Sequence, residues 1–203
     1  MLYDKDIREP LFEFLDEEFG KCRVIEEKTM GRSRADVVMI TEDAITGIEI
    51  KSDADTYTRL ERQVKDYDKF FDRNILVAGS SHALHVKEHV PEHWGIITVE
   101  EVENEADFYF YRRPQALPPR KMRLKYQLRM LWREELAHIQ ELNHMPRYKE
   151  KSKKFVQEKI LEKVPSEILL PQIREELFER DYNGIAERIR AYRKETISQE
   201  EEE

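Results

Sequence analysis

The chain has 203 residues, of which 39% are hydrophobic and 38% are charged, and its formal net charge is −8 at pH 7. One main domain and a small appendage fit this length, because typical domains contain roughly 100–150 residues. No apolar run approaches the roughly 18 residues that cross a membrane, and the start MLYDKDIREP lacks the features of a secretory signal. A single cysteine, Cys22, excludes an internal disulfide. We therefore expect a cytoplasmic protein that does not contact membranes.

The first 112 residues alternate between helical and strand patterns. An apolar period through Ile7, Leu11, Leu15 and Phe19 predicts a helix over residues 4–19. The patterns that follow predict strands at 22–30, 35–41, 48–51, 74–80, 95–100 and 107–112, with helices at 58–71 and around 82–90. This order of elements indicates a mixed α/β protein, in which helices flank a central mixed β-sheet.

The composition changes at RRPQALPPR, where prolines break regular structure. Beyond this stretch the chain reads as helical throughout. The expected helices cover about 122–143, 151–164, 167–179 and 183–194. We therefore expect an α/β core at 1–112, a basic, all-helical module at 113–195 and an acidic, disordered tail at 196–203.

The charge is unevenly distributed along the chain. Residues 112–163 contain 15 Lys and Arg against 6 Glu, a local charge of +9, so the remainder of the chain carries −17. A basic surface on an acidic protein attracts polyanions locally, while the total charge keeps the molecule in solution. The alternative explanation of this local charge is a helical hairpin whose lysines only keep its surface solvated.

The helical half includes a leucine-rich helix, a turn and a Ser-Lys-x-x-hydrophobic helix. This pattern is similar to SAP-type DNA-binding modules, which present basic residues of paired helices to phosphates. The resemblance implies contacts to nucleic acid by Arg147, Lys149, Lys151, Lys153 and Lys154. Such contacts position a protein without reading sequence, and their affinity depends strongly on salt. Alternatively, these helices form a cap that packs on the sheet with Trp132 as its anchor.

The stretch GIEIKS raises a chemical question, because a charged pair interrupts an apolar strand. Ile48 and Ile50 point to one face of a strand, whereas Glu49 and Lys51 point to the other. Asp36 begins the neighbouring strand and is expected opposite Glu49 across a hairpin. Two carboxylates, a backbone carbonyl and waters suit a hard ion such as Mg²⁺ or Mn²⁺. An isolated E-x-K, however, is usually a solvated pair.

The predicted helix at 58–71 adds Gln63 and Tyr67, which lie four residues apart and therefore on one face. Tyr67 also fits the apolar stripe of this helix, so packing explains it equally well. Gln63 has no such packing role. These two residues favour a functional site at Glu49 and Lys51 over a strand on which both charges only face solvent.

Two further features have weaker support. Arg32 and Arg34 precede Asp36 and could clamp a phosphate, although turn solvation explains them equally well. His85 and His89 have a spacing that suits zinc. No third zinc ligand is evident, so a polar helix face is favoured for these histidines.

The sequence RAD, EIK and QVKDY, in this order, resembles the PD-(D/E)XK nuclease superfamily, in particular the RecB-like branch with a Q-x-x-x-Y helix. Residues 31–77 are also similar to largely uncharacterised bacterial and prophage proteins of that superfamily. The resemblance covers roughly residues 1–110. It implies a restriction-endonuclease-like α-β-β-β-α-β core and a metal-dependent phosphodiesterase that leaves a 5′-phosphate.

The resemblance also implies roles for individual residues. Asp36, Glu49 and the carbonyl of Ile50 would bind Mg²⁺ or Mn²⁺, and Lys51 takes the place of the catalytic lysine. The supporting helix motif of the superfamily is matched by Gln63 and Tyr67.

This sequence departs from the superfamily pattern at two points. Ala35 replaces the proline that gives the superfamily its name. The upstream acidic ligand is ambiguous among Glu9, Glu13, Glu26 and Glu27, and the last two are favoured because they precede Asp36 on a neighbouring strand. We assign this role to Glu27.

The sequence therefore predicts a Mg²⁺-dependent deoxyribonuclease with a basic helical module that holds DNA. One alternative is a nucleic-acid-binding protein whose nuclease-like core is inactive. Another is a regulatory subunit whose basic helices bind an acidic partner. The sequence favours DNA over RNA without deciding between them, and a homodimer is possible because nuclease relatives often dimerise.

Overall fold

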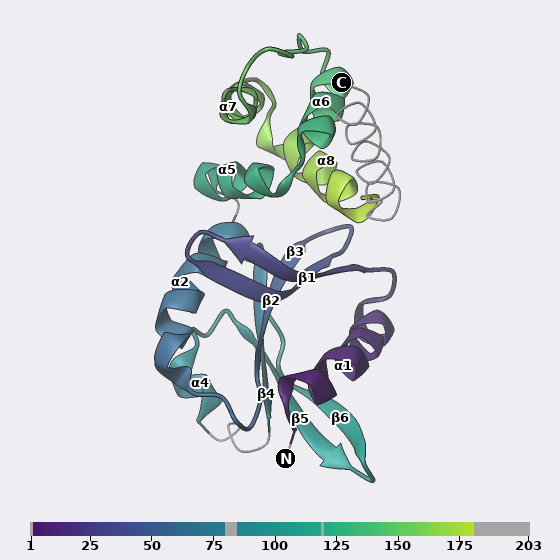
Figure 1. Cartoon of the computed structure of the whole chain (residues 1–203), viewed down its shortest axis with the longest axis vertical. Coiled ribbons are helices and arrows are strands. Elements are labelled where there is room, and N and C mark those ends of the chain that lie inside the picture. Colours follow the sequence, from purple (N-terminus) through teal and green to yellow (C-terminus); the bar gives the residue numbers. More distant parts are fainter. Residues whose placement is uncertain (1, 80–84, 119, 181–203) are drawn as a thin grey trace, which may run out of the picture.

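The computed structural model describes residues 2–79, 85–118 and 120–180, and the side chains of 121 and 122 are left out of the description. A twisted β-sheet forms the centre of the α/β part, and a group of helices lies at one end of it (Figure 1). Helix α1 (Asp4–Phe19) covers one face of the sheet, and α2 (Leu60–Phe70) with α4 (Val86–His89) covers the other. The mixed α/β fold expected from the sequence, with a C-terminal helical extension, is confirmed.

The described residues form a six-stranded mixed sheet in the order β1-β2-β3-β4-β5-β6. The strands are β1 (Arg23–Met30), β2 (Ser33–Ile40), β3 (Ile45–Lys51), β4 (Arg73–Gly79), β5 (Gly95–Val102) and β6 (Glu105–Arg112). Strands β1, β2 and β3 pair antiparallel, β3, β4 and β5 pair parallel, and β6 returns antiparallel to β5. Because β3 and β4 are parallel, the chain must cross between them, and α2 forms this crossover. The predicted α-β-β-β-α-β order is therefore observed.

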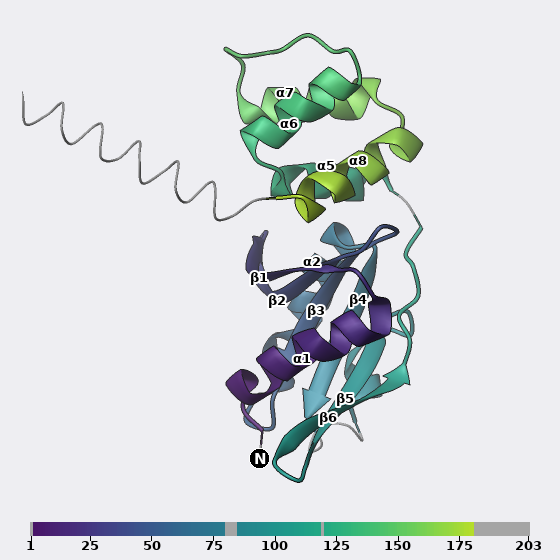
Figure 2. The same cartoon turned by 90° about the vertical axis from the view of Figure 1, so that its right-hand side faces the viewer.

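Helix α1 packs through the apolar stripe that its sequence predicts. Ile7, Leu11 and Leu15 are fully buried in a cluster with the inward side chains of β2 to β5. Phe14 stacks on Phe108 of β6, with ring centroids 5.2 Å apart. The 90° view shows α1 lying across this face of the sheet (Figure 2).

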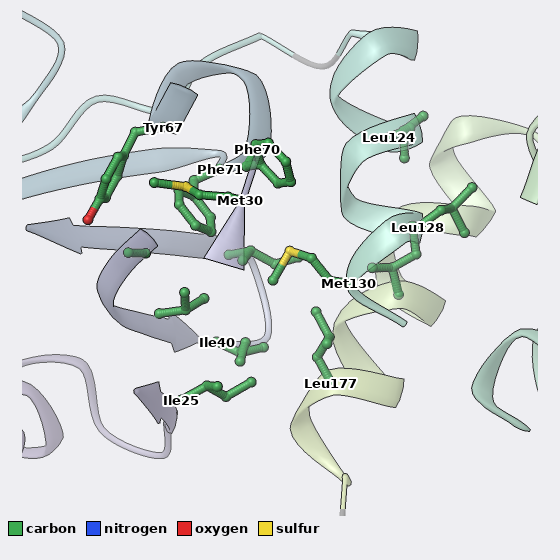
Figure 3. Packing of buried hydrophobic residues seen from close by; sticks show 14 of the residues in the cluster. Ile25, Met30, Ile40, Tyr67, Phe70, Phe71, Leu124, Leu128, Met130 and Leu177 are labelled. Atoms are coloured by element: carbon green, nitrogen blue, oxygen red, sulfur yellow. The ribbon is translucent and has the colours of Figure 1, made fainter. Parts of the chain in front are cut away.

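The helical extension packs on the α/β part through a continuous apolar cluster. Its helices are α5 (Lys121–Met130), α6 (Arg133–Leu142), α7 (Lys153–Lys163) and α8 (Ser166–Phe178). Leu124 and Leu128 of α5 and Leu177 of α8 belong to the same buried cluster as Met30 and Phe70 (Figure 3). The helices therefore form a cap on the sheet, but Trp132, expected as its anchor, is only half-buried and lies outside this cluster, with the Arg180 guanidinium 4.0 Å from its ring centroid. The division of the chain after residue 112 stays a prediction.

Some helix boundaries differ from those expected. The helix predicted at 122–143 is two helices, because Leu131 and Trp132 leave the helical conformation between α5 and α6. The backbone N–H of Trp132 donates to Glu135 Oε2 at 2.5 Å, which starts a new helix at this point. Arg180 then holds Glu135 in a buried ion pair with an N–O distance of 2.6 Å.

Two other expectations fall partly outside the described residues. The helix expected around 82–90 is seen only as α4, and residues 80–84 are not described. The expected helix at 183–194 and the tail at 196–203 lie wholly outside the described residues. Within the described residues, no helix is both long and apolar enough to cross a membrane.

Gly47 of β3 lets α2 approach the sheet closely. A Cβ atom at this position would overlap the ring of Phe71 and lie 2.7 Å from Cδ1 of Tyr67. Backbone atoms of β3 therefore contact two aromatic rings where any other residue would place a side chain. This close approach brings Tyr67 within reach of the next residues of β3.

We predict that Gly47→Ala destabilises the protein by about 1–3 kcal/mol, because the added methyl group must displace a buried ring. Urea unfolding followed by circular dichroism measures the change. Thr58→Ala, at an exposed position, is the control and should change stability by less than about 0.5 kcal/mol. A Gly47→Ala protein as stable as this control would contradict the close packing.

Candidate active site

The pairing of β2 and β3 ends where the charged residues begin. Backbone partners run from Ile40 and Ile45 to Val37 and Ile48. Beyond them, the N–H of Ile50 donates to Oδ2 of Asp36 at 2.8 Å. The N–H and C=O of a strand residue point to the same side, so the Ile50 carbonyl also faces Asp36.

A shift in side-chain alternation accompanies this change. Ala35 packs in the cluster on the α2 face, whereas Val37 packs in the cluster on the α1 face, although alternation would place them together. In β1, Glu27 has a positive φ of 51° between residues that pair with Ala35 and Val37. Irregularities of this kind re-aim side chains next to functional sites. Here the irregularity directs the Asp36 carboxylate toward β3.

Glu49 is the centre of the candidate site. Its side chain is buried, with only 1% exposed, and lies on the face of β3 that packs against α2. Three donors surround its carboxylate. Lys51 Nζ lies 2.5 Å from Oε1, the Tyr67 hydroxyl donates to Oε2 at 2.7 Å, and Gln63 Nε2 donates to Oε1. The structure therefore brings together the strand pair and the helix pair that the sequence singled out.

Asp36 is less well compensated than Glu49. Burial and the nearby negative charge of Glu49 raise the pKa of Asp36 to about 7. The N–H of Ile50 and the charges of Lys51 and Arg8 oppose this shift only in part. Complete burial, and after it the charges of the same two carboxylates, raise the pKa of the Tyr67 hydroxyl well above its usual value. The site thus concentrates negative charge that a cation would relieve.

The oxygen atoms here fit a hard divalent cation. Asp36, Glu49 and the Ile50 carbonyl supply the carboxylate and carbonyl ligands that Mg²⁺ and Mn²⁺ prefer. Oε1 of Gln63 is also buried, with no hydrogen-bond partner among the described residues. Within those residues, however, no group of three or more His, Cys, Asp or Glu side chains is placed to hold a metal. Backbone, amide and water oxygens would have to complete the coordination.

The upstream acids do not join Asp36 and Glu49. Glu27 forms an ion pair with Arg34 at 3.2 Å, and Glu26 forms one with Arg8 at 3.4 Å. Of these two acids, Glu27 lines the pocket of the site, as expected, but its carboxylate is engaged elsewhere in this structure.

The two other candidates for the upstream acid lie elsewhere. Glu9 and Glu13 line a separate groove between α1 and the β5–β6 hairpin. Neither Glu9 nor Glu13 is among the described residues that line the pocket of Asp36 and Glu49.

The candidate site opens into a polar pocket of about 550 Å³. Asp36, Glu49, Ile50 and Lys51 contribute to its lining. The arginines that line it are Arg8, Arg32, Arg34, Arg59 and Arg62. A pocket that combines buried carboxylates with several arginines suits a phosphate ester and a bridging cation.

Sequence reasoning placed Arg32 and Arg34 at this pocket but missed the other three arginines. Arg59 precedes Gln63 by four residues, so helical spacing could have placed it on the face of Gln63. Arg8 comes from α1, and its Nη1 donates to the Asp36 carbonyl at 3.1 Å. No short-range signal in the sequence indicates that long-range contact.

The basic residues predicted in the helical half lie away from this pocket. Arg147, Lys149, Lys151, Lys153 and Lys154 are all exposed. They occupy the connection between α6 and α7 and the first turn of α7. Both views place this connection at the end of the helical extension that is farthest from the sheet (Figures 1 and 2).

The two histidines with zinc-compatible spacing also have other surroundings. His89 stacks on Tyr57, with ring centroids 4.1 Å apart. His85 lies 3.5 Å from Glu88 on the exposed surface. Neither belongs to a metal-holding group among the described residues.

Fold and site together describe a mixed α/β protein with a carboxylate–lysine cluster where β2 and β3 separate. The chain belongs to the family described as bacteriophage P4 protein cII, whose model matches residues 1–200. This agrees with the expected likeness to phage-borne proteins. The family description names no activity, so the nuclease assignment remains a proposal.

Other comparisons add little to this family assignment. No curated protein matches the chain. The structure of SfsA from Pyrococcus furiosus in complex with Ca²⁺ is similar at 15% sequence identity, with a TM-score of 0.33. The match covers 53% of this chain and 61% of SfsA.

We predict that Asp36→Asn stabilises the metal-free protein, and does so more as the pH rises. The folded pKa of Asp36 is about 7, above its usual 3.8, so the native state resists losing this proton. Stability of the wild type should therefore fall as the pH rises between these values, whereas an asparagine does not titrate. The stability difference should grow by about 2.6 kcal/mol between pH 5 and pH 8.

Urea unfolding with EDTA at several pH values measures this difference. Asp43→Asn is the control, since the pKa of Asp43 is lowered mainly through hydrogen bonds from Thr41 and Arg73 that outweigh its burial. Its substitution should not stabilise the protein. A pH-independent difference at Asp36 would show that this carboxylate ionises normally.

Proposed function

We propose that this protein is a metal-dependent deoxyribonuclease with a PD-(D/E)XK core. The observation that supports this most is the convergence of Asp36, Glu49 and Lys51 from two strands with Gln63 and Tyr67 from one helix. The resemblance to that superfamily assigns a role to each of these five residues. A solvated E-x-K pair would leave Glu49 exposed, but only 1% of it is exposed.

Each residue has a role in this proposal. Asp36, Glu49 and the Ile50 carbonyl would hold Mg²⁺ or Mn²⁺, which when bound polarises a phosphoryl oxygen and makes water a better nucleophile. Lys51 would orient that water or stabilise negative charge that develops on the phosphate. To do so, Lys51 Nζ must weaken its contact with Glu49 Oε1 and form one with the water or the phosphate.

Gln63 and Tyr67 act through Glu49 in this proposal. Their donors fix two directions around its carboxylate, so its orientation is set before any ligand binds. Tyr67 is fully buried, and its raised pKa keeps it a hydrogen-bond donor. We therefore assign both as positioning residues.

A basic helical surface supports nucleic acid as the substrate. Lys149 and Lys154 are exposed, and no described residue forms an ion pair with either. Arg147, by contrast, pairs with Glu141 at 2.5 Å. Uncompensated lysines at one end of the molecule suit phosphate contacts that do not depend on sequence.

A second candidate function is DNA binding without hydrolysis. It is favoured by the engaged Glu27 and by the lack of a third acidic ligand next to Asp36 within the described residues. In that case Lys51 would serve only to neutralise Glu49. The two candidates differ in whether Mg²⁺ or Mn²⁺ binds and whether DNA is cut.

We predict that the wild type cuts labelled DNA with Mg²⁺ or Mn²⁺, and that Lys51→Met or Asp36→Asn lowers the rate at least about 100-fold, since each removes charge from the reacting centre. Linear, circular single-stranded and branched DNA are compared on gels. Lys65→Met, which removes an exposed lysine on α2, should cut like the wild type.

Calorimetry with Mg²⁺ and Mn²⁺ accompanies this assay. Metal binding that Asp36→Asn abolishes would support the assigned ligands. DNA binding without metal binding or cleavage, in wild type and variants alike, would favour the second candidate.

We also predict that Lys149→Gln with Lys154→Gln weakens duplex binding and reduces its salt dependence. Each lost phosphate contact should lower the slope of log K against log salt by about 0.9. Fluorescence anisotropy at several salt concentrations measures this slope. Lys5→Gln with Lys87→Gln removes the same charge from α1 and α4 and should leave the slope unchanged, and equal slopes in all proteins would remove this surface as a DNA contact.

A further inference from the structure

Three arginines at the pocket have no charge partner among the residues that the structure describes. Arg32 lies in the turn between β1 and β2, and Arg59 and Arg62 lie where the 3-10 helix η1 (Tyr57–Arg59) leads into α2. All three are exposed and line the pocket, and no described residue forms an ion pair with any of them. Arg8 and Arg34, in contrast, are paired with Asp4, Glu26 and Glu27. These three guanidinium groups can therefore bind an anionic ligand without first breaking an ion pair with a described residue.

These arginines come from two segments that form walls of the pocket. The β1–β2 turn forms one wall with Arg32, and the start of α2 forms the other with Arg59 and Arg62. Between them the floor is recessed, because Glu49 and Lys51 are only 1% and 7% exposed. A phosphate must therefore enter the pocket to reach Glu49 and Lys51.

A buried hydrogen bond fixes the distance between these walls. Ser33, which follows the β1–β2 turn, donates from Oγ to Oδ2 of Asp66 on α2 at 2.7 Å. Both residues are buried, and Lys69 Nζ holds the other oxygen of Asp66 at 3.1 Å. Separating the walls would leave a buried carboxylate with an unsatisfied oxygen, which costs free energy. The pocket is thus unable to widen without that penalty.

The lining of the pocket offers charged contacts for phosphates. Of the described residues that line it, none is aromatic, so it provides no aromatic ring on which a base could stack. A rigid duplex presents its phosphates on a convex surface and keeps its second strand alongside. An unpaired strand bends freely and can place one phosphate in a recess.

We infer that the pocket takes a single, unpaired DNA strand, with Arg32 and the pair Arg59 and Arg62 contacting phosphates on either side of the reacting one. This inference rests on the proposed nuclease function and adds the form of its substrate. Arg59 and Arg62 are positioning residues here, because they hold the strand and do not touch the reacting bond.

Binding without metal tests the inference apart from catalysis. Full-length protein is titrated, in EDTA and at several salt concentrations, with a labelled 20-nucleotide oligothymidylate or a 20-base-pair duplex. Arg59→Gln with Arg62→Gln should lower the salt slope for the single strand by about 1.4, since each phosphate contact contributes about 0.7. The same variant should bind the duplex like the wild type.

The control is Lys65→Gln with Lys87→Gln, which removes two exposed positive charges outside the pocket. It should bind the single strand with the wild-type slope. The inference is overturned if the two double variants behave alike on the single strand, or if the arginine variant loses as much on the duplex.

Cleavage of a gapped duplex with Mg²⁺ or Mn²⁺ separates this inference from the proposed function. Cuts confined to the unpaired segment support both. Equal cutting of paired and unpaired segments overturns the inference and leaves the nuclease function standing. No cutting at all, with the arginine effect on single-strand binding intact, overturns the nuclease function and keeps the pocket as a strand-binding site.

Discussion

The arrangement of this protein depends on one buried carboxylate. Placing the charge of Glu49 between a sheet and a helix costs several kcal/mol unless hydrogen bonds and opposite charge offset that cost. Lys51 supplies the charge, and Gln63 and Tyr67 supply hydrogen bonds from α2. The same contacts fix how α2 lies on β3, and Gly47 allows the close approach that they need. The contacts of Glu49 therefore both hold α2 against β3 and form the candidate site.

For Asp36, the contacts that stabilise the carboxylate charge do not offset the cost of burying it. Asp36 is half-buried, and its burial and the nearby charge of Glu49 outweigh the partners that stabilise its charge, so its pKa rises to about 7. A residue that lowers stability in the isolated protein is typical of sites that bind a ligand, where activity and stability conflict. Of the two neighbouring carboxylates, Glu49 is thus compensated by three donors within the protein, whereas Asp36 gains most from a bound cation.

Much of the fold could be predicted from local patterns. Apolar periodicity located α1, α2 and the strands, and the order of RAD, EIK and QVKDY located Asp36, Glu49, Lys51, Gln63 and Tyr67. Contacts between distant segments could not be predicted in this way. The break between α5 and α6 contains no glycine or proline, and it is stabilised by Arg180, 45 residues beyond Glu135. Likewise, the ion pair of Glu27 with Arg34 depends on a local backbone irregularity that residue types do not encode.

The apolar cluster that continues from the sheet into α5 and α8 has a mechanical consequence. Strand β3 begins near α5, where Asp72 accepts hydrogen bonds from both Ile45 and Gln127, and it ends at Lys51. Its seven residues alone span roughly 20 Å, and the connection between α6 and α7 lies at the end of the helical extension farthest from the sheet (Figure 1). Because the helices share a core with the sheet, the distance between Lys51 and the α6–α7 connection is fixed. A flexible linker would instead allow this distance to vary. A polyanion that touches both ends must exceed a minimum length, and beyond that length its second contact becomes intramolecular. The fixed separation would therefore select polyanions by their length.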